Sequence, residues 1–193
     1  MKYKIRIRTG ETALNKGNES YFDGVAGYEA DGFKVAYISL GSNVGDSVKN
    51  LENALSAIKR LPDTAVEKTS GIFITAPVGY TDQNDFYNAA VKIKTKLPPE
   101  ALLGALLGIE AALGRVRTFK NAPRIIDLDL LIYGDKISNT DFLTLPHPRM
   151  FERPFITAVL KPILSEDSIY FNRLSPVNFK ADGIVFTGKY PEW

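Results

Sequence analysis

Apolar and polar residues alternate along much of the chain, and the period of this alternation predicts its strands and helices. Period-two patterns and dense apolar runs predict four strands, over residues 34–40, 65–75, 86–97 and a last run that ends before Gly134. Apolar residues at helical spacing predict two helices, over 46–61 and 98–113. The order β-α-β-β-α-β predicts an α+β, ferredoxin-like fold, in which two helices pack on one face of an antiparallel sheet.

This pattern divides the chain into a central domain at 34–163, an N-terminal extension at 1–33 and a C-terminal tail at 164–193. Near its start, the extension alternates apolar residues with lysine and arginine, which predicts a strand with one basic face. The rest of the extension is rich in glycine and asparagine and is typical of loops. We expect the extension and the tail to pack together on the central domain.

After Gly134 the pattern predicts a short hairpin and a third helix. The hairpin spans 137–145, and a proline-rich link joins it to a helix over 150–164. If that helix begins early, Arg149 and Arg153 lie on one of its faces, although Pro154 favours a later start. The tail then contains two candidate strands, at 169–171 and 183–187.

The composition narrows the possible functions. The chain has 193 residues, 45% hydrophobic and 24% charged, with a net charge of +2. These values are typical of one globular domain and give no overall excess of positive charge for binding a polyanion. The absence of cysteine excludes disulfides and thiol nucleophiles, and the single histidine, His147, excludes a multi-histidine metal site. No long apolar span is present, so we expect a soluble cytoplasmic protein.

A pair of acids in the fourth strand is the main candidate for chemistry. Residues two apart in a strand point to the same face, so Asp127 and Asp129 share one face while Leu128, Leu130 and Ile132 share the other. Two carboxylates that close repel each other unless a cation lies between them. Magnesium commonly takes one or two carboxylates together with substrate phosphates. A solvated face with no ligand explains the same pair equally well.

A basic segment precedes these acids and would meet such phosphates. Its four cations are Arg115, Arg117, Lys120 and Arg124. The combination favours phosphoryl-type chemistry, whereas surface ion pairs are the alternative. The turn at 41–43 could cradle a phosphate but lacks the lysine and spacing of a P-loop, so ordinary turn chemistry is the better interpretation. Glu110 lies at the unfavourable end of the second helix, where a partner cation, a ligand or plain exposure would explain it.

Five segments resemble one enzyme family, in its order and at its spacing. They are AYISLGSNVGD, TAPVGYTDQNDFYNAAV, IEAALGRVR, NAPRIIDLDLLIYG and LTLPHPRMFERPF. Together they resemble 6-hydroxymethyl-7,8-dihydropterin pyrophosphokinase from Val35 to about Pro162. The resemblance implies the ferredoxin-like fold and transfer of the β,γ-pyrophosphate of ATP to the pterin hydroxymethyl group, with release of AMP, in folate synthesis. It also implies two Mg²⁺ ions, small-molecule substrates and neither a nucleic acid nor a membrane as partner.

The resemblance also assigns residues. Asp127 and Asp129 would bind the metal and, with Arg115 and Arg124, form the catalytic set. The residues expected to contact ATP are Glu110, Arg115, Arg124, Leu130, Thr144, His147 and Arg153. The residues expected to bind the pterin are Thr75, Pro77, Val78, Phe86, Asn88 and Phe155. The loops at 76–87 and 116–124 would be the lids.

Several positions depart from the family pattern. Phe86 stands where some members have tyrosine, Asn121-Ala122 replaces a common Trp-Gly pair, and Thr118 and Phe142 replace basic residues of some members. These changes predict altered closure of the second lid and weaker nucleotide binding with the same reaction. An RNA-binding module of the same fold and a pterin binder without activity are the competing hypotheses. We expect a monomer, and channelling with neighbouring folate enzymes remains open.

Overall fold

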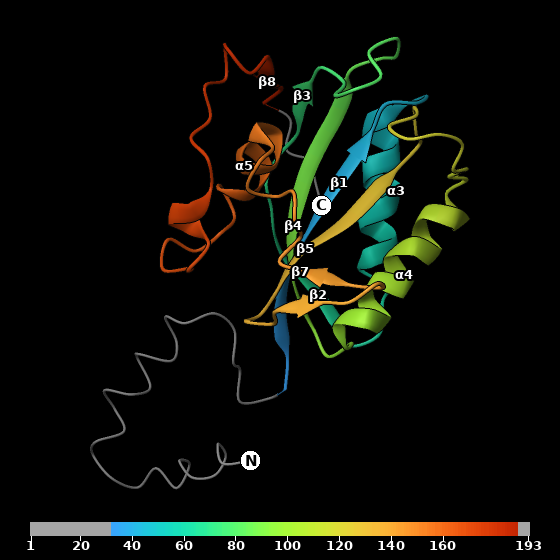
Figure 1. The fold of residues 1–193 in the computed structure, drawn as a ribbon. Coiled ribbons are helices and arrows are strands. Elements are labelled where there is room, and N and C mark those ends of the chain that lie inside the picture. Colours follow the sequence, from blue (N-terminus) through green and yellow to red (C-terminus); the bar gives the residue numbers. More distant parts are fainter. Residues whose placement is uncertain (1–31, 189–193) are drawn as a thin grey trace, which may run out of the picture.

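The computed structural model describes residues 32–188, and within them a six-stranded antiparallel sheet forms the centre of the domain (Figure 1). The main strand order is β5-β1-β4-β3-β8, and β2 also pairs with β4. The strands are β1 (Lys34–Ser42), β2 (Thr64–Thr69), β3 (Phe73–Thr75), β4 (Phe86–Thr95), β5 (Asp127–Tyr133) and β8 (Ile184–Phe186). Without β8, this arrangement is the ferredoxin-like sheet that the sequence predicts. The predicted basic strand near the N-terminus lies outside the described residues.

Helices cover both faces of this sheet. The helices α3 (Ser47–Ile58) and α4 (Pro99–Ala112) lie on one face, and α5 (Pro154–Leu160) lies on the other (Figure 1). Asp46 caps α3, because its carboxylate accepts a hydrogen bond from the Lys49 amide at 3.0 Å. The sequence predicts all three helices, but the expected two-layer arrangement does not include α5 on the second face, where it adds a third layer.

The remaining elements are short. A two-stranded hairpin is formed by β6 (Ser138–Asn139) and β7 (Thr144–Leu145), within the predicted span. The tail segment predicted as a strand at 169–171 instead contains turns and runs into the 3-10 helix η2 (Phe171–Arg173). The second tail strand is present as β8, which pairs with β3.

Two strand predictions need correction. The run at 65–75 is two strands, because Gly71 has a φ of +73° and the Ser70 hydroxyl accepts a hydrogen bond from the Ala90 amide at 2.8 Å in place of a ladder bond. The first strand does not turn at Gly41 but continues to Ser42, where it still pairs with β4.

The fourth strand does not alternate to its end as predicted. A register shift in the pairing of β1 with β5 leaves Leu131 as an extra residue. Leu128 and Leu130 therefore face the helices α3 and α4, but Ile132 packs on the opposite face with α5. A β-bulge reverses the direction of the side chains that follow it, and nothing in the local sequence marks its position.

The third helix begins later than residue 150. Pro154 occupies its first turn, where the missing N–H costs no helix bond, and Arg153 is its N-cap residue in extended backbone. Arg149 precedes the helix by several residues. Arg149 and Arg153 are therefore not neighbours on a helix face, and any role that they share depends on the folding of the link before α5.

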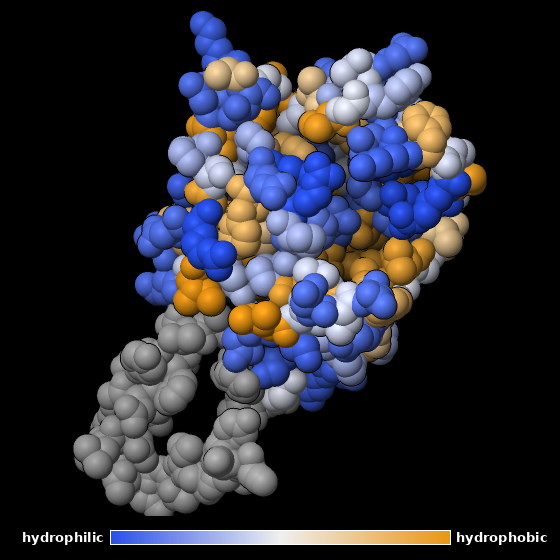
Figure 2. All heavy atoms as spheres, viewed as in Figure 1, coloured by the Kyte–Doolittle hydropathy of each residue, from blue (hydrophilic) through white to orange (hydrophobic). Residues whose placement is uncertain are grey.

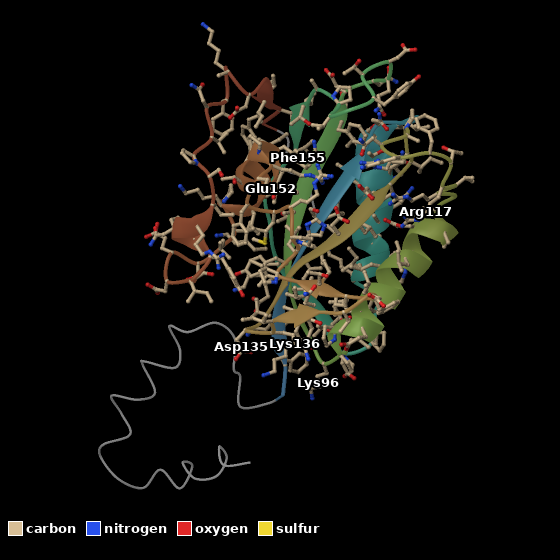
Figure 3. The ribbon with its side chains drawn as sticks, viewed as in Figure 1. Lys96, Arg117, Asp135, Lys136, Glu152 and Phe155 are labelled. Atoms are coloured by element: carbon tan, nitrogen blue, oxygen red, sulfur yellow. The ribbon has the colours of Figure 1, made fainter. Side chains whose placement is uncertain are left out.

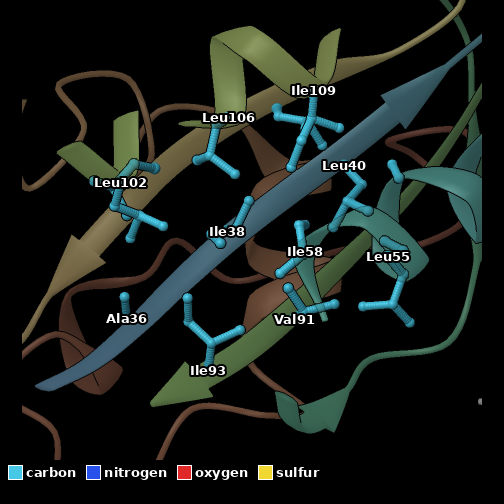
Figure 4. Packing of buried hydrophobic residues seen from close by; sticks show 14 of the residues in the cluster. Ala36, Ile38, Leu40, Leu55, Ile58, Val91, Ile93, Leu102, Leu106 and Ile109 are labelled. Atoms are coloured by element: carbon cyan, nitrogen blue, oxygen red, sulfur yellow. The ribbon is translucent and has the colours of Figure 1, made fainter. Parts of the chain in front are cut away.

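The sheet separates two hydrophobic cores. The larger core packs α3 and α4 against β1 and its neighbours, as the close view in Figure 4 shows. The smaller core lies under α5 and includes Tyr170, Leu174 and Ile184 from the tail. No helix in the described part of the chain is long and apolar enough to cross a membrane.

Candidate active site

A cavity lies on the α5 face of the sheet, where the adjacent strands β5, β1 and β4 bring polar residues together. These residues point away from α3 and α4, because they alternate with residues of the larger core. The residues that line the cavity from these strands are Ser39, Leu40, Gly41, Phe86, Asn88, Asp127 and Asp129. The walls come from Thr75, Ala76, Val78, Asn121, Arg124, Arg149, Arg153, Phe155 and Val159.

The two predicted acids both line this cavity. Asp127 forms ion pairs with Arg115 and with Arg124, whose Nε lies 3.1 Å from Oδ2. Asp129 forms no ion pair with any residue between 32 and 188, and burial together with the charge of Asp127 raises the pKa of its carboxyl. The negative charge at Asp129 is therefore less well compensated than that at Asp127.

The donor set suits a hard divalent cation that is shared with a substrate. Within residues 32–188, no group of three or more histidine, cysteine, aspartate or glutamate side chains could hold a metal ion. Two carboxylates alone make an incomplete coordination sphere, which phosphate oxygens and water complete in typical magnesium sites. The uncompensated Asp129 fits this use, so the residues present are compatible with Mg²⁺.

Glu110 is the ion-pairing centre beside the acidic pair. It is only 3% exposed, and its carboxylate contacts Arg115, lies 2.9 Å from the Arg117 guanidinium and accepts a hydrogen bond from the Leu128 amide at 2.7 Å. Burial raises its pKa. A partner cation, one of the three possibilities open from the sequence, therefore explains its position. Glu110 joins the end of α4 to the start of β5 and holds Arg115 against Asp127.

Beside the acids, the cavity includes a second part lined by Thr75, Phe86, Asn88 and Phe155, which we call the slot. The Asn88 side chain is 5% exposed and donates from Nδ2 to the Thr75 hydroxyl at 2.9 Å and to the Phe86 carbonyl at 3.3 Å. These bonds fix the amide in one orientation. The Arg124 guanidinium lies over the Phe86 ring at 4.9 Å, and Phe155 forms part of the wall from α5. Figure 3 places Phe155 on the α5 side of the sheet and Arg117 beside the end of α4.

Several residues assigned from the resemblance lie outside this lining. Leu130 is buried in the larger core, Thr144 lies in β7 and Pro77 lies beside the lining residues Ala76 and Val78. His147 follows β7, and its backbone amide donates to the Leu131 carbonyl at 2.8 Å. Burial lowers the pKa of His147, against the opposing effect of the Asp129 charge. His147 is therefore near the acidic pair without lining the slot.

Asn43 is a central residue that the sequence predicts only as part of a turn. Its buried side chain donates to Gln83 at 2.8 Å and to the Asn84 carbonyl at 2.9 Å, and it accepts from the Arg124 amide at 2.9 Å. Gln83 in turn donates to the Asn121 carbonyl at 3.0 Å. These bonds connect the end of β1 to both loops that the resemblance predicts to be lids.

The two loops also touch through their aromatic residues. The Tyr80 and Phe119 rings meet edge to face at 5.2 Å, and a side chain at Gly79 would overlap the Asn121 amide. Asn121, one of the positions at which the resemblance predicts a departure from the family pattern, adopts a φ of +62°. In the view of Figure 2, strongly hydrophilic residues gather over the upper half of the face, at the end of the sheet where these loops lie.

Comparison with known proteins identifies the family. Residues 37–165 match the family model described as 7,8-dihydro-6-hydroxymethylpterin-pyrophosphokinase (HPPK). The chain belongs to the HPPK family. It is 44% identical over 132 residues to 2-amino-4-hydroxy-6-hydroxymethyldihydropteridine pyrophosphokinase of Bacillus subtilis, covering 68% of this chain and 79% of that protein. The enzyme of the same name from Haemophilus influenzae is 43% identical over 131 residues, covering 68% of this chain and 82% of its own length.

Longer relatives contain the HPPK segment as one part. The folic acid synthesis protein fol1 of Pneumocystis carinii is 45% identical over 131 residues, covering 68% of this chain but only 17% of that protein. The chain thus spans less than a fifth of that relative. The solved Plasmodium falciparum HPPK-DHPS structure with STZ-DHP aligns with a TM-score of 0.58 at 17% identity, covering 75% of this chain and 42% of that one. This likeness supports the fold.

Proposed function

We propose that this HPPK chain transfers pyrophosphate from ATP to 6-hydroxymethyl-7,8-dihydropterin and releases AMP and the pterin diphosphate, as a step of folate synthesis. The observation that carries the proposal is one cavity in which a carboxylate pair, Asp127 and Asp129, adjoins an aromatic slot with a fixed amide. Transfer of a phosphoryl-type group requires alignment and charge neutralisation more than covalent help from the protein. The slot can align the pterin, and the charged side chains around it can neutralise the charge of the transferred group.

The acidic pair would hold the metal. Asp127 and Asp129 provide oxygen ligands on one face of β5, and we propose that they bind two Mg²⁺ ions together with the phosphates of ATP. Bound magnesium supplies neutralisation of charge along the phosphate chain. When it binds, Arg115 and Arg124 would exchange their contacts with Asp127 for contacts with phosphate oxygens, because both cations already lie at that carboxylate.

Arginine side chains would then orient the triphosphate. The guanidinium fork suits pairs of phosphate oxygens. Arg115 and Arg124 from the segment before β5, and Arg153 from the start of α5, lie around the acidic pair. His147 would steady the negative charge that develops on the AMP leaving oxygen. Loss of such a contact lowers the rate more than it lowers substrate affinity.

The slot would hold the flat pterin ring. Phe86 and Phe155 line it and can stack against an aromatic heterocycle. The Asn88 amide can donate to and accept from the edge of the ring, and Thr75 keeps that amide in place. Val78 is exposed at the mouth of the slot, where the loop at 76–87 would cover the bound ring.

Other assignments remain predictions from the resemblance. Contacts of ATP with Glu110, Leu130 and Thr144 are among them, and so are the pterin contact of Pro77, a cytoplasmic location and a monomeric state. The carboxylate of Glu110 is already occupied by Arg115, Arg117 and a backbone amide. The fused HPPK-DHPS protein supports the idea that this domain works beside other folate enzymes.

Separation of the nucleotide products tests the proposal. We expect AMP to form only when the chain, ATP, Mg²⁺ and the hydroxymethyl-dihydropterin are all present, in equal amount with a pterin diphosphate. Omission of the pterin and addition of a magnesium chelator are the controls. Formation of ADP would indicate ordinary phosphoryl transfer, and binding of the pterin without any nucleotide turnover would favour a pterin binder. Either result would contradict the proposal.

A further inference from the structure

The cations of the active site differ in how well they are neutralised. Arg115 and Arg117 are held by Glu110, and Arg124 is held by Asp127. Arg149 and Arg153 also line the cavity, yet neither guanidinium forms an ion pair within residues 32–188. Arg149 and Arg153 are therefore the cations of the cavity lining that no carboxylate of the described residues holds in a direct ion pair.

The backbone around Arg149 is firmly placed. Its amide lies 3.3 Å from Nδ1 of His147 and donates to it, and the next residue, Met150, donates from its amide to the His147 carbonyl at 3.1 Å. Met150 is fully buried in the smaller core. The Arg149 side chain remains exposed. This residue thus presents a movable guanidinium from a fixed point at the rim of the cavity.

Arg149 and Arg153 oppose each other electrostatically. The Nε of Arg153 is buried and makes no hydrogen bond to any described residue. Burial lowers the pKa of Arg153 and the charge of Arg149 lowers it further, against the opposing effect of the Asp129 and Asp127 charges. Repulsion between two guanidinium groups on one wall raises the free energy of the unliganded protein. The buried donor of Arg153 that has no acceptor raises it further. A shared oxyanion removes both costs, since it accepts from the two cations at once.

We propose that Arg149 is a further substrate-binding residue, which acts with Arg153 as a two-arginine clamp on the diphosphate group that is transferred. This inference rests on the proposed function. Arg149 and Arg153 line the same cavity as Asp129, where the metal-bound phosphates would lie, and Phe155, where the pterin would lie. The Arg153 guanidinium lies 5.7 Å from the centre of the Phe155 ring and interacts electrostatically with Asp129. The group that passes from ATP to the pterin must move within this cavity. The clamp holds the diphosphate both before and after transfer, and it leaves the AMP portion alone.

Binding measurements on Arg149→Gln, Arg149→Lys and a control test the clamp. Arg60→Gln is the matched control, because Arg60 is an exposed arginine that follows α3 on the opposite face of the sheet. The probes are inorganic pyrophosphate with Mg²⁺, a non-hydrolysable ATP analogue, and AMP. A charge-assisted contact is worth enough to change affinity roughly tenfold or more. We expect Arg149→Gln to weaken binding of pyrophosphate and of the analogue by about that factor, with AMP affinity changed less than about twofold.

The second substitution and the control distinguish the clamp from a general loss of affinity. Arg149→Lys keeps the charge but loses the fork, so we expect an intermediate loss of affinity. Arg60→Gln should behave like the wild type, and all variants should keep the wild-type melting temperature. Equal weakening for AMP and pyrophosphate, or no change in Arg149→Gln, would overturn the clamp. Pyrophosphate binding is measurable whether or not the wild type forms AMP, so this failure is distinct from failure of the proposed reaction.

Discussion

Gly41 determines how much room the active site has at its floor. It lies in β1 opposite Asp127, and a Cβ placed on it would lie 3.3 Å from Oδ1 of Asn88, 3.8 Å from Cβ of Asp127 and 3.9 Å from the Phe86 ring. The first of these contacts is tighter than ordinary van der Waals packing. Because Gly41 has no side chain, the space between the Asn88 amide and Asp127 stays open.

Gly41→Ala is expected to weaken pterin binding while leaving the fold intact. The added methyl group requires the Asn88 amide to shift by a few tenths of an ångström, away from its present orientation on the Thr75 hydroxyl, and a weakened hydrogen bond of this kind costs about 1 kcal/mol. We expect the pterin KM to rise roughly fivefold or more. Gly108→Ala is the control, since its Cβ meets nothing within 4 Å, and it should leave KM unchanged. An unchanged KM in Gly41→Ala would contradict this view of the slot.

Glu110→Gln separates an organising role for Glu110 from direct ATP binding. Glutamine can still accept from the Leu128 amide but loses the ion pairs with Arg115 and Arg117. Arg115 keeps its ion pair with Asp127, so the expected cost is that of the lost charge-assisted hydrogen bonds, about 2 kcal/mol. We expect lower stability in urea and a lower kcat, because Arg115 is held less firmly in place. A raised ATP KM with unchanged stability would instead indicate direct contact with ATP.

At the scale of elements, the two loops over the cavity behave as a connected pair. Asn43 ties both to the end of β1, and Gln83 bonds to the carbonyl of Asn121. The buried amide of Asn43 has its donors and its acceptor satisfied. Closure of one loop should therefore move the other.

Asn43→Ala should release both loops together. It leaves the Arg124 amide and the Asn84 carbonyl without these partners, which we expect to cost about 2 kcal/mol in the free energy of unfolding. Limited proteolysis should cut faster within both 76–85 and 116–124. Asn53→Ala is the control, because Asn53 is exposed on α3. Faster cutting in one loop alone would show that the loops are not connected through Asn43.

Local patterns predicted most elements, and long-range contacts caused the errors. Alternation placed Asp127 and Asp129 on one face of β5, since that rule depends only on residues two apart. The partners of Asn43 lie 40 and 81 residues away, so a turn was the only local interpretation of it. The bulge at Leu131 likewise arises from pairing with β1 and reversed the predicted direction of Ile132.

At the scale of the whole molecule, the face of the sheet that α5 covers is the one that carries the cavity. The sequence predicted the sheet and its first two helices correctly. The helical period of residues 150–164 predicted a third helix, but it does not indicate which face of the sheet that helix covers. On that face, tail residues complete the core under α5, and β8 pairs with β3 more than 100 residues earlier in the chain. The same face carries the cavity of the candidate active site, so the tail supports the wall that contains Phe155.

Ile184→Ala should test this support. Ile184 is 5% exposed in the smaller core, and an isoleucine-to-alanine change in a core costs about 2–5 kcal/mol. Val185 on the same strand is 58% exposed, so Val185→Ala should change stability by less than about 0.5 kcal/mol. Urea unfolding measures both. Equal effects of the two changes would mean that β8 does not contribute to the core.

The magnesium dependence of AMP release in wild type, Asp127→Asn and Asp129→Asn tests the proposed reaction most directly. Each substitution preserves the shape of the side chain and removes one charged metal ligand from β5. We expect the pterin-dependent rate of AMP formation to fall by about 100-fold or more in both variants, while circular dichroism shows that both remain folded. Wild-type rates and an unchanged magnesium requirement in either folded variant would contradict the central claim that this acidic pair holds the metal for pyrophosphate transfer.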